Sequence, residues 1–189
     1  MRKDLDDQLV ADYPKIFRDR HASMRVTAMC WGFEHGDGWH GPLRQACSLM
    51  QHHIDASRQE RARALRYNRA LKRAVAGDVS ALERFYAGSL ELDDWARKRA
   101  VDDAARNVAR AVPPACPQVV ASQVKEKFGT MRFYYHGGDE FTEGVVSMLE
   151  AVSGITCEQC GNPGTLGGTG WLTTLCASCR DAAREPAAS

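Results

Sequence analysis

The sequence lacks any long apolar run and any excess of charge of one sign. No segment supplies the ~18 apolar residues that a membrane-spanning helix needs, and residues 1–7 carry charge where a secretory signal would be apolar. The 25 basic side chains are nearly balanced by 24 acidic ones, so no overall positive field attracts nucleic acid. We therefore expect a soluble, cytoplasmic protein that makes no membrane contact and in which any nucleic-acid binding is local.

A disulfide framework is missing as well. The chain has seven cysteines, an odd number, and Cys30, Cys47 and Cys116 are far apart in the sequence. The other four form two Cys-x-x-Cys pairs near the C-terminus. This distribution is typical of an intracellular protein with a metal site and differs from that of a secreted disulfide scaffold.

The two pairs predict a structural zinc ribbon over residues 155–181. Its four ligands would be Cys157, Cys160, Cys176 and Cys179. Two residues between paired thiolates allow both to bind one tetrahedral ion, and four thiolates leave that ion no open position for catalysis. Gly161 permits the left-handed backbone that such a knuckle requires. We expect zinc as the cofactor.

A pair of redox-active dithiols is the alternative for these cysteines. It would require a thioredoxin-like strand and helix around one pair, which the sequence does not provide. The only formal charges in the ribbon are Glu158, Arg180 and Asp181, and phosphate binding would need several cations. We therefore expect the ribbon to stabilise the fold or to contact protein. Its small core would consist of Trp171, Leu172 and Leu175.

The segments before the ribbon predict a hairpin with helices around it. Residues 119–124 and 131–135 alternate as strands do, and Gly129 supplies the turn between them. A two-stranded hairpin needs a covering surface, which a helix over residues 142–153 would provide. Further helices are expected over 5–17, where Pro14 bends or ends the helix, and over 43–54. Between them, residues 30–41 predict a loop rich in glycine and tryptophan.

Residues 57–114 differ in composition and predict a helical insertion. They are rich in alanine, arginine and aspartate, and helical periodicity runs through them. Asp93 or Asp94 would cap the third helix. Its buried line would be Val101, Ala104, Val108 and Val112. Pro113 and Pro114 then end the insertion.

These patterns together predict an α+β fold, with helices plus a β-hairpin, a C-terminal four-cysteine zinc ribbon and a helical insertion. The expected parts are 1–56 with the first helix, the loop and the second helix, 57–114 as the insertion, 115–154 as the hairpin and its helix, 155–181 as the ribbon, and 182–189 as a disordered tail.

The glycine and tryptophan loop also holds candidate functional groups. His35, Asp37 and His40 are residue types that bind a second metal or act as an acid and base pair, which would make the protein a metal-dependent enzyme. Their spacing in a glycine-rich loop fixes no geometry. The alternative is that these polar groups satisfy the backbone of a loop packed by Trp31, Phe33 and Trp39.

Residues 58–73 form the only strongly basic stretch. The candidate anion-binding side chains there are Arg58, Arg61, Arg66, Arg69 and Arg73. A nucleic acid or a nucleotide would bind at this helix through its phosphates. The alternative is a solvated helix whose charges pair inside the insertion with acids such as Asp102 and Asp103.

Three sequence blocks resemble a family of uncharacterised phage and prophage zinc-ribbon proteins. The blocks are Asp12-Tyr-Pro-Lys-Ile-Phe17, Cys30-Trp-Gly-Phe-Glu-His-Gly-Asp-Gly-Trp39 and Gln123-Val-Lys-Glu-Lys-Phe-Gly-Thr-Met-Arg-Phe-Tyr134, followed by the Cys157 knuckle. The family often has a cysteine at the position of His35. The resemblance implies a phage or prophage origin and carries no catalytic residues. It also implies an accessory protein that binds a host macromolecule in a bacterial cell, foremost a host protein of the kind that acts in antiviral defence.

Overall fold

The computed structural model describes residues 1–88 and 94–183 and shows an α+β protein. Contacts divide the chain into two units. We call them the sheet unit, which holds Met1–Ile54 and the chain from Cys116 onward, and the helical unit, Asp55–Ala115. These boundaries lie within two residues of those expected for the insertion. Asp93 and residues 184–189 of the expected tail lie outside the described residues.

A three-stranded sheet forms the centre of the sheet unit. Its order is β1 (Phe33–Glu34), β2 (Val120–Lys127) and β3 (Thr130–His136), with β1 parallel and β3 antiparallel to β2. Phe128 and Gly129 join β2 to β3 with φ angles of 55° and 79°, as a type I′ turn requires. The predicted hairpin is therefore confirmed, whereas β1 lies inside the segment expected to be a loop.

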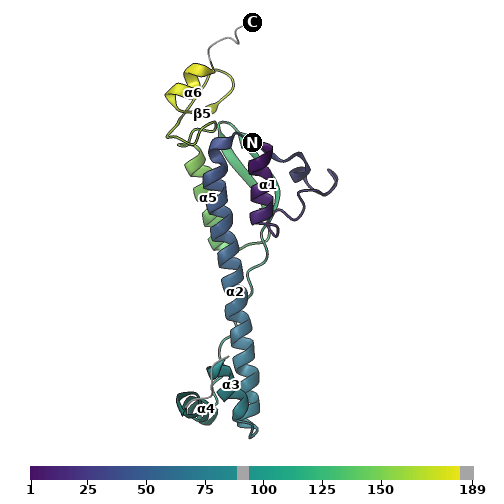
Figure 1. The fold of residues 1–189 in the computed structure, drawn as a ribbon, viewed down its shortest axis with the longest axis vertical. Helices are drawn as coiled ribbons and strands as arrows, with labels where there is room; N and C mark the ends of the chain where they lie inside the picture. Colours follow the sequence, from purple (N-terminus) through teal and green to yellow (C-terminus); the bar gives the residue numbers. More distant parts are fainter. Residues whose placement is uncertain (89–93, 184–189) are drawn as a thin grey trace. The chain divides into compact units, whose positions relative to one another are not determined.

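Helices pack around this sheet (Figure 1). They are α1 (Lys3–Asp12), the first part of α2 (His40–Val75) and α5 (Glu140–Ser153). Two short 3-10 helices, Ala28–Trp31 and Asp37–Trp39, lie in the loop before α2. The largest buried side chains of the core they enclose are Leu9, Ile16, Phe17, Met29, Trp39, Leu43, Met50, Ile54, Val119 and Met131.

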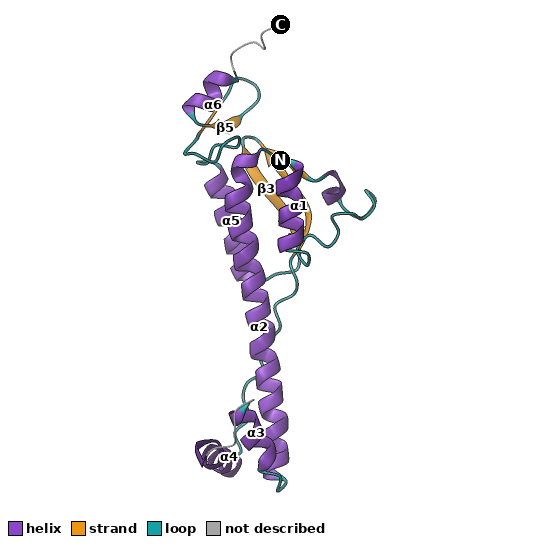
Figure 2. Ribbon diagram, in the orientation of Figure 1, coloured by secondary structure: helices purple, strands orange, loops and turns teal. Residues whose placement is uncertain are grey.

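The structure decides one expected helix end and corrects another. The helix expected over 5–17 ends before Pro14, at Asp12, which is one of the two outcomes expected at that proline, because Tyr13 precedes a proline and leaves the helical region. The helix expected over 43–54 does not end there: α2 continues into the insertion and is 36 residues long (Figure 2). No glycine or proline occurs between Pro42 and Gly77, so the change in composition at residue 57 marks a change of packing partner inside one helix.

The helical unit has its own small core. It consists of the second part of α2 with α3 (Ser80–Ala87) and α4 (Asp94–Arg106), and its buried residues include Tyr67, Leu71 and Leu82. The predicted buried line of α4 is wrong. The helix buries Ala96, Ala100 and Asp103, while Val101 and Val108 are exposed and Asn107, with a φ of 50°, ends the helix.

Asp103 is the polar centre of this core. Its carboxylate accepts hydrogen bonds from the hydroxyls of Tyr67, at 3.1 Å, and Tyr86, and Arg99 lies 3.6 Å away. Burial alone would raise the pKa of Asp103, but the hydrogen bonds from Tyr86 and Tyr67 outweigh it and lower the pKa. A buried carboxylate with three partners thus ties α2, α3 and α4 together.

Replacing Asp103 with alanine is expected to destabilise the helical unit by about 2–3 kcal/mol, because two buried hydroxyls lose their acceptor. The measurement is amide hydrogen exchange of residues 55–75 and of α3 and α4. Asp102→Ala is the matched control, since its side chain is exposed one position away. Equal effects of the two substitutions would contradict the role of Asp103.

The last part of the sheet unit is a small ribbon. Strands β4 (Thr165–Gly167) and β5 (Thr173–Leu175) form an antiparallel pair, and α6 (Ala177–Ala182) follows. Thr174 Oγ1 donates to the carbonyl of Gly129 at 2.6 Å, so the ribbon is attached to the turn of the hairpin. Across residues 1–88 and 94–183, no helix is both long enough and apolar enough to span a bilayer.

Candidate metal centre and its docked loop

The four cysteines of the ribbon lie together. Their sulfur atoms are all within 4.8 Å of one another, and Sγ of Cys160 is 3.7 Å from Sγ of Cys176. The first pair follows α5, while Cys176 caps α6 and Cys179 lies in its first turn. The β4–β5 hairpin reverses the chain direction and so places the second pair of cysteines beside the first. The structure therefore brings the predicted ligands into one group that can bind a metal ion.

Backbone hydrogen bonds shape the first knuckle. The amide of Cys157 donates to the carbonyl of Asn162 at 2.7 Å, and the amide of Gly161 donates to the carbonyl of Cys157 at 2.9 Å. Gly161 has a φ of 80°, as its position after the second cysteine predicts. The knuckle geometry therefore comes from the backbone and does not need a large apolar core.

The thiols of the second pair differ in acidity. The hydroxyl of Ser178 and the amide of Cys179 lower the pKa of Cys176 to about 6. The neighbouring sulfurs of Cys176 and Cys160 raise the pKa of Cys179 to about 12. One thiolate thus forms near neutral pH, and its negative charge opposes ionisation of the next. A bound cation removes this repulsion, so metal binding displaces the remaining protons.

The ribbon has less core than expected. Leu175 is buried, but Trp171 is 74% exposed and Leu172 is also exposed. The prediction that all three form a core is therefore wrong for two of them. With so little apolar burial, the ribbon depends on its cysteines for order.

The glycine and tryptophan loop packs on the cysteine knuckle. The amide of Gly38 donates to the backbone carbonyl of Glu158 at 2.7 Å, and the amide of Gly36 donates to its side-chain carboxylate at 3.0 Å. The fully buried Trp39 donates from Nε1 to the carbonyl of Thr156 at 2.8 Å. Glu158 thus joins the loop to the candidate metal centre, a role that no local sequence pattern indicates.

Both glycines of this loop are required by the close approach of the knuckle. A Cβ atom on Gly38 would lie 2.1 Å from the carbonyl oxygen of Cys157 and 2.4 Å from the amide nitrogen of Gly161. A Cβ on Gly36 would lie 2.4 Å from the carbonyl oxygen of Glu158. The signal in the sequence is the Gly-x-Gly-Trp spacing. It places two residues without a side chain, Gly36 and Gly38, and the large side chain of Trp39 against the same knuckle.

The polar side chains of the loop, His35, Asp37 and His40, do not lie together as a metal or acid–base site would require. Asp37 accepts a hydrogen bond from the amide of Arg2 at 2.7 Å and pairs with its guanidinium at 2.6 Å. His35 is buried and its Nδ1 donates to the carbonyl of Gly36 at 2.8 Å. His40, half-buried, starts α2. Among the described residues, these three side chains form no group whose ligand atoms lie within 4.8 Å of one another.

The burial of His35 predicts acid sensitivity. Burial lowers the pKa of His35 to about 4 from the usual 6.5, so between these values the unfolded chain binds a proton that the folded chain does not. Stability should therefore fall as pH decreases from 6.5 to 4, by up to about 3 kcal/mol. His35→Gln should remove this part of the slope, measured by denaturant unfolding at each pH. His52→Gln, at an exposed position, should keep it.

The predicted arginines divide into two groups in the helical unit. Arg66, Arg69 and Arg73 of α2 line a hollow of about 130 Å³ together with Arg84 of α3. Arg73 pairs with Asp78 at 2.5 Å, whereas the other three form no ion pair within the described part of the chain. The remaining two predicted arginines lie elsewhere. Arg61 donates to the carbonyl of Pro113 at 2.7 Å and Arg58 lies 3.9 Å from Asp55.

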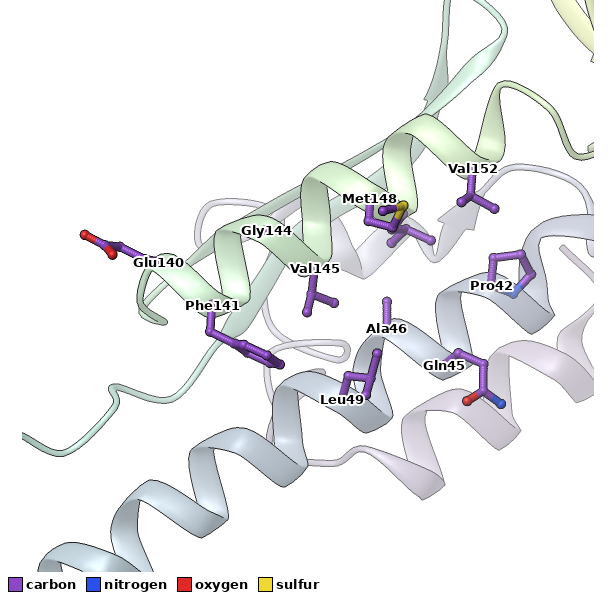
Figure 3. Close-up of a pocket in the computed structure, with 11 residues that line it drawn as sticks. Pro42, Gln45, Ala46, Leu49, Glu140, Phe141, Gly144, Val145, Met148 and Val152 are labelled. Atoms are coloured by element: carbon purple, nitrogen blue, oxygen red, sulfur yellow. The ribbon is translucent and has the colours of Figure 1, made fainter.

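An apolar groove lies between α2 and α5 in the sheet unit. It has a volume of about 840 Å³, and Figure 3 shows Phe141 and Val145 of α5 pointing toward Ala46 and Leu49 of α2. Leu49, Phe141 and Met148 are 53%, 47% and 65% exposed. The other residues that line it are Pro42, Gln45, Glu140, Gly144, Leu149 and Val152.

Comparison with known proteins gives no further guide to function. The chain matches no known family, no curated protein and no solved structure. The features of the chain that indicate a function are therefore the candidate metal centre, the groove and the arginine hollow.

Proposed function

We propose that this chain is a zinc-stabilised binding protein that holds an apolar segment of a partner protein in the groove between α2 and α5. The observation that carries the proposal is the exposure of Leu49, Phe141 and Met148 along one groove. Contiguous exposed apolar surface marks interaction sites. A groove between two helices fits the apolar face of a third helix, and the flexible Met148 adapts to irregular partners.

Zinc is the metal that best suits the four-cysteine group. Thiolates favour zinc, whose bonds to sulfur are about 2.3 Å long, so the sulfurs of a tetrahedral site lie about 3.8 Å apart. The separation of 3.7 Å between Cys160 and Cys176 agrees with this value. With four thiolates the ion has no open position, and its role is structural.

The partner we propose is a host protein in a bacterial cell. The resemblance to phage and prophage zinc-ribbon proteins supports this choice, and a component of antiviral defence is the class of target that such an accessory protein would inhibit. The ribbon carries few cations, which favours protein over nucleic acid as its neighbour.

A paired pull-down tests the groove. Met148→Glu and Leu49→Glu place a charge in the groove at exposed positions, so the fold should be retained while the stoichiometric partner captured by the wild-type chain from host lysate is lost. Val101→Glu is the matched control, because Val101 is exposed on helix α4 of the other unit. Retention of the same partner by both groove variants would refute the groove as its binding site.

The arginine hollow favours a second candidate function, the binding of a nucleic acid or nucleotide phosphate. Arg66, Arg69 and Arg84 line one hollow and form no ion pair among the described residues, although Asp78 is near enough to Arg84 to interact with its charge, and arginine binds phosphate through paired donors. Replacing each with glutamate should weaken oligonucleotide binding at low salt and reduce the salt slope by about 1. Arg25→Glu, at an exposed position in the sheet unit, is the control. Absence of binding by the wild-type chain at low salt would eliminate this function.

A further inference from the structure

A second cluster of metal-binding side chains lies in the sheet unit on elements other than the ribbon. It consists of His53 on α2, Cys116 in the segment before β2 and Asp139, the N-cap of α5. Each offers one ligand atom, and these atoms all lie within 4.8 Å of one another. His53 Nε2 is 2.7 Å from Asp139 Oδ2. Three residues distant in the sequence thus present sulfur, nitrogen and oxygen donors to one point.

Each of the three side chains is held in place by other contacts. Asp139 Oδ1 accepts the amide of Thr142 at 3.2 Å in a capping box, which leaves Oδ2 directed to the cluster. The ring of His53 stacks on Phe141 with centroids 4.3 Å apart. Cys116 is buried in the core of the sheet unit. The fold therefore positions all three donors, and an ion that binds them replaces the hydrogen bond between His53 and Asp139.

The cluster is open on one side. The side chains of His53 and Asp139 are 30% and 39% exposed, whereas Cys116 is buried. An ion can therefore enter from the side of the imidazole and the carboxylate, and the thiol forms the floor of the site. This exposure also leaves one coordination position for water.

The charges of the cluster suit a divalent ion. A thiolate from Cys116 and the carboxylate of Asp139 carry two negative charges, and the imidazole of His53 is neutral when it binds a metal. One divalent ion makes the site neutral, so its burial carries little electrostatic penalty. Zinc binds cysteine sulfur, histidine nitrogen and carboxylate oxygen alike, so each of the three donors suits it.

We propose that His53, Cys116 and Asp139 form a second metal site that binds Zn²⁺ or a similar divalent transition-metal ion, with water in the fourth position. On binding, the Cys116 thiol loses its proton to solvent, and His53 binds through an unprotonated ring nitrogen. His53 immediately precedes the last residue of the sheet unit before the helical unit, and Cys116 is the first residue after it. The ion thus joins the points at which the chain leaves and re-enters the sheet unit.

Titration of the full chain with Co²⁺ after removal of metal under reducing conditions tests the site. The wild-type chain should bind two equivalents of Co²⁺. The thiolate-to-cobalt charge-transfer absorbance of the second site should be about a quarter of that of the ribbon site, because the second site has one thiolate and the ribbon has four. Cys116→Ser and His53→Asn should weaken one of the two sites by more than about tenfold. The controls are His52→Asn, at the histidine next to His53, and Cys30→Ser, at a cysteine outside both clusters. Both variants should leave the two sites intact.

The ribbon variant Cys176→Ser with Cys179→Ser identifies the remaining site. It should retain one equivalent, and that equivalent should be lost when His53→Asn is added. A single equivalent in the wild-type chain that His53→Asn leaves unchanged would overturn the proposal. If Cys116→Ser does not fold, His53→Asn decides, because His53 is partly exposed and its replacement leaves the core intact.

Discussion

Replacing Gly38 with alanine should destabilise the sheet unit by about 3 kcal/mol or more. The added Cβ atom would lie 2.1 Å from the carbonyl oxygen of Cys157, and because both partners are backbone, the loop has to move away from the knuckle. That movement breaks the hydrogen bond from Gly38 to Glu158 and displaces the buried indole of Trp39. Denaturant unfolding of the metal-loaded chain measures the loss.

Gly41→Ala is the matched control and should have the opposite sign. Gly41 lies three residues away, inside α2, and a Cβ atom there would meet nothing within 4 Å. Alanine favours the helix over glycine by up to about 1 kcal/mol, so this variant should be slightly more stable than the wild type. Similar destabilisation by both substitutions would show that the contact between Gly38 and the knuckle does not determine stability.

Removal of the metal should have the second large effect. Four-cysteine sites supply about 10–16 kcal/mol of apparent binding free energy in small zinc domains, and the ribbon has too few buried apolar residues to fold without it. After chelation, amide exchange of residues 155–180 should approach the rate of an unfolded chain. The amides of Gly36 and Gly38 should lose protection in the same step, because both donate to Glu158.

The helical unit provides the internal control for this experiment. Its core is formed by residues of α2, α3 and α4 and contains none of the ribbon cysteines, so exchange in α3 and α4 should not change. If the ribbon stays protected after complete removal of metal, the cysteines do not stabilise it. If the ribbon loses protection while Gly36 and Gly38 keep theirs, the loop is held by other contacts.

The features that the sequence predicts correctly depend on local spacing. Two residues between thiolates, alternation along two strands and a glycine at a tight turn each determine a geometry within a few residues. The group of four cysteines and the β2–β3 hairpin follow from these rules. They need no knowledge of the rest of the chain.

The features that the sequence does not predict depend on distant partners. Strand β1 has only two residues, and its pairing with β2 follows from the tertiary fold. The buried face of α4 is lined by Ala96 and Ala100, while larger valines on the same helix are exposed, because small residues allow close packing where α4 meets its neighbours. Arg84 and Asp139 are separated from their site partners by many residues, so no local pattern indicates them.

Under the proposed function, the contact between loop and knuckle would link metal binding to the groove. Gly38 and Trp39 are fixed by the knuckle, and the chain enters α2 at the next residue, so Pro42 and Gln45 of the groove lie within two turns of this anchor. A partner that binds only the ordered start of α2 must therefore raise the metal affinity of the ribbon, and the metal must raise the affinity for the partner by the same factor. The concentration of available metal in the cell would then set how much of the chain is competent to bind.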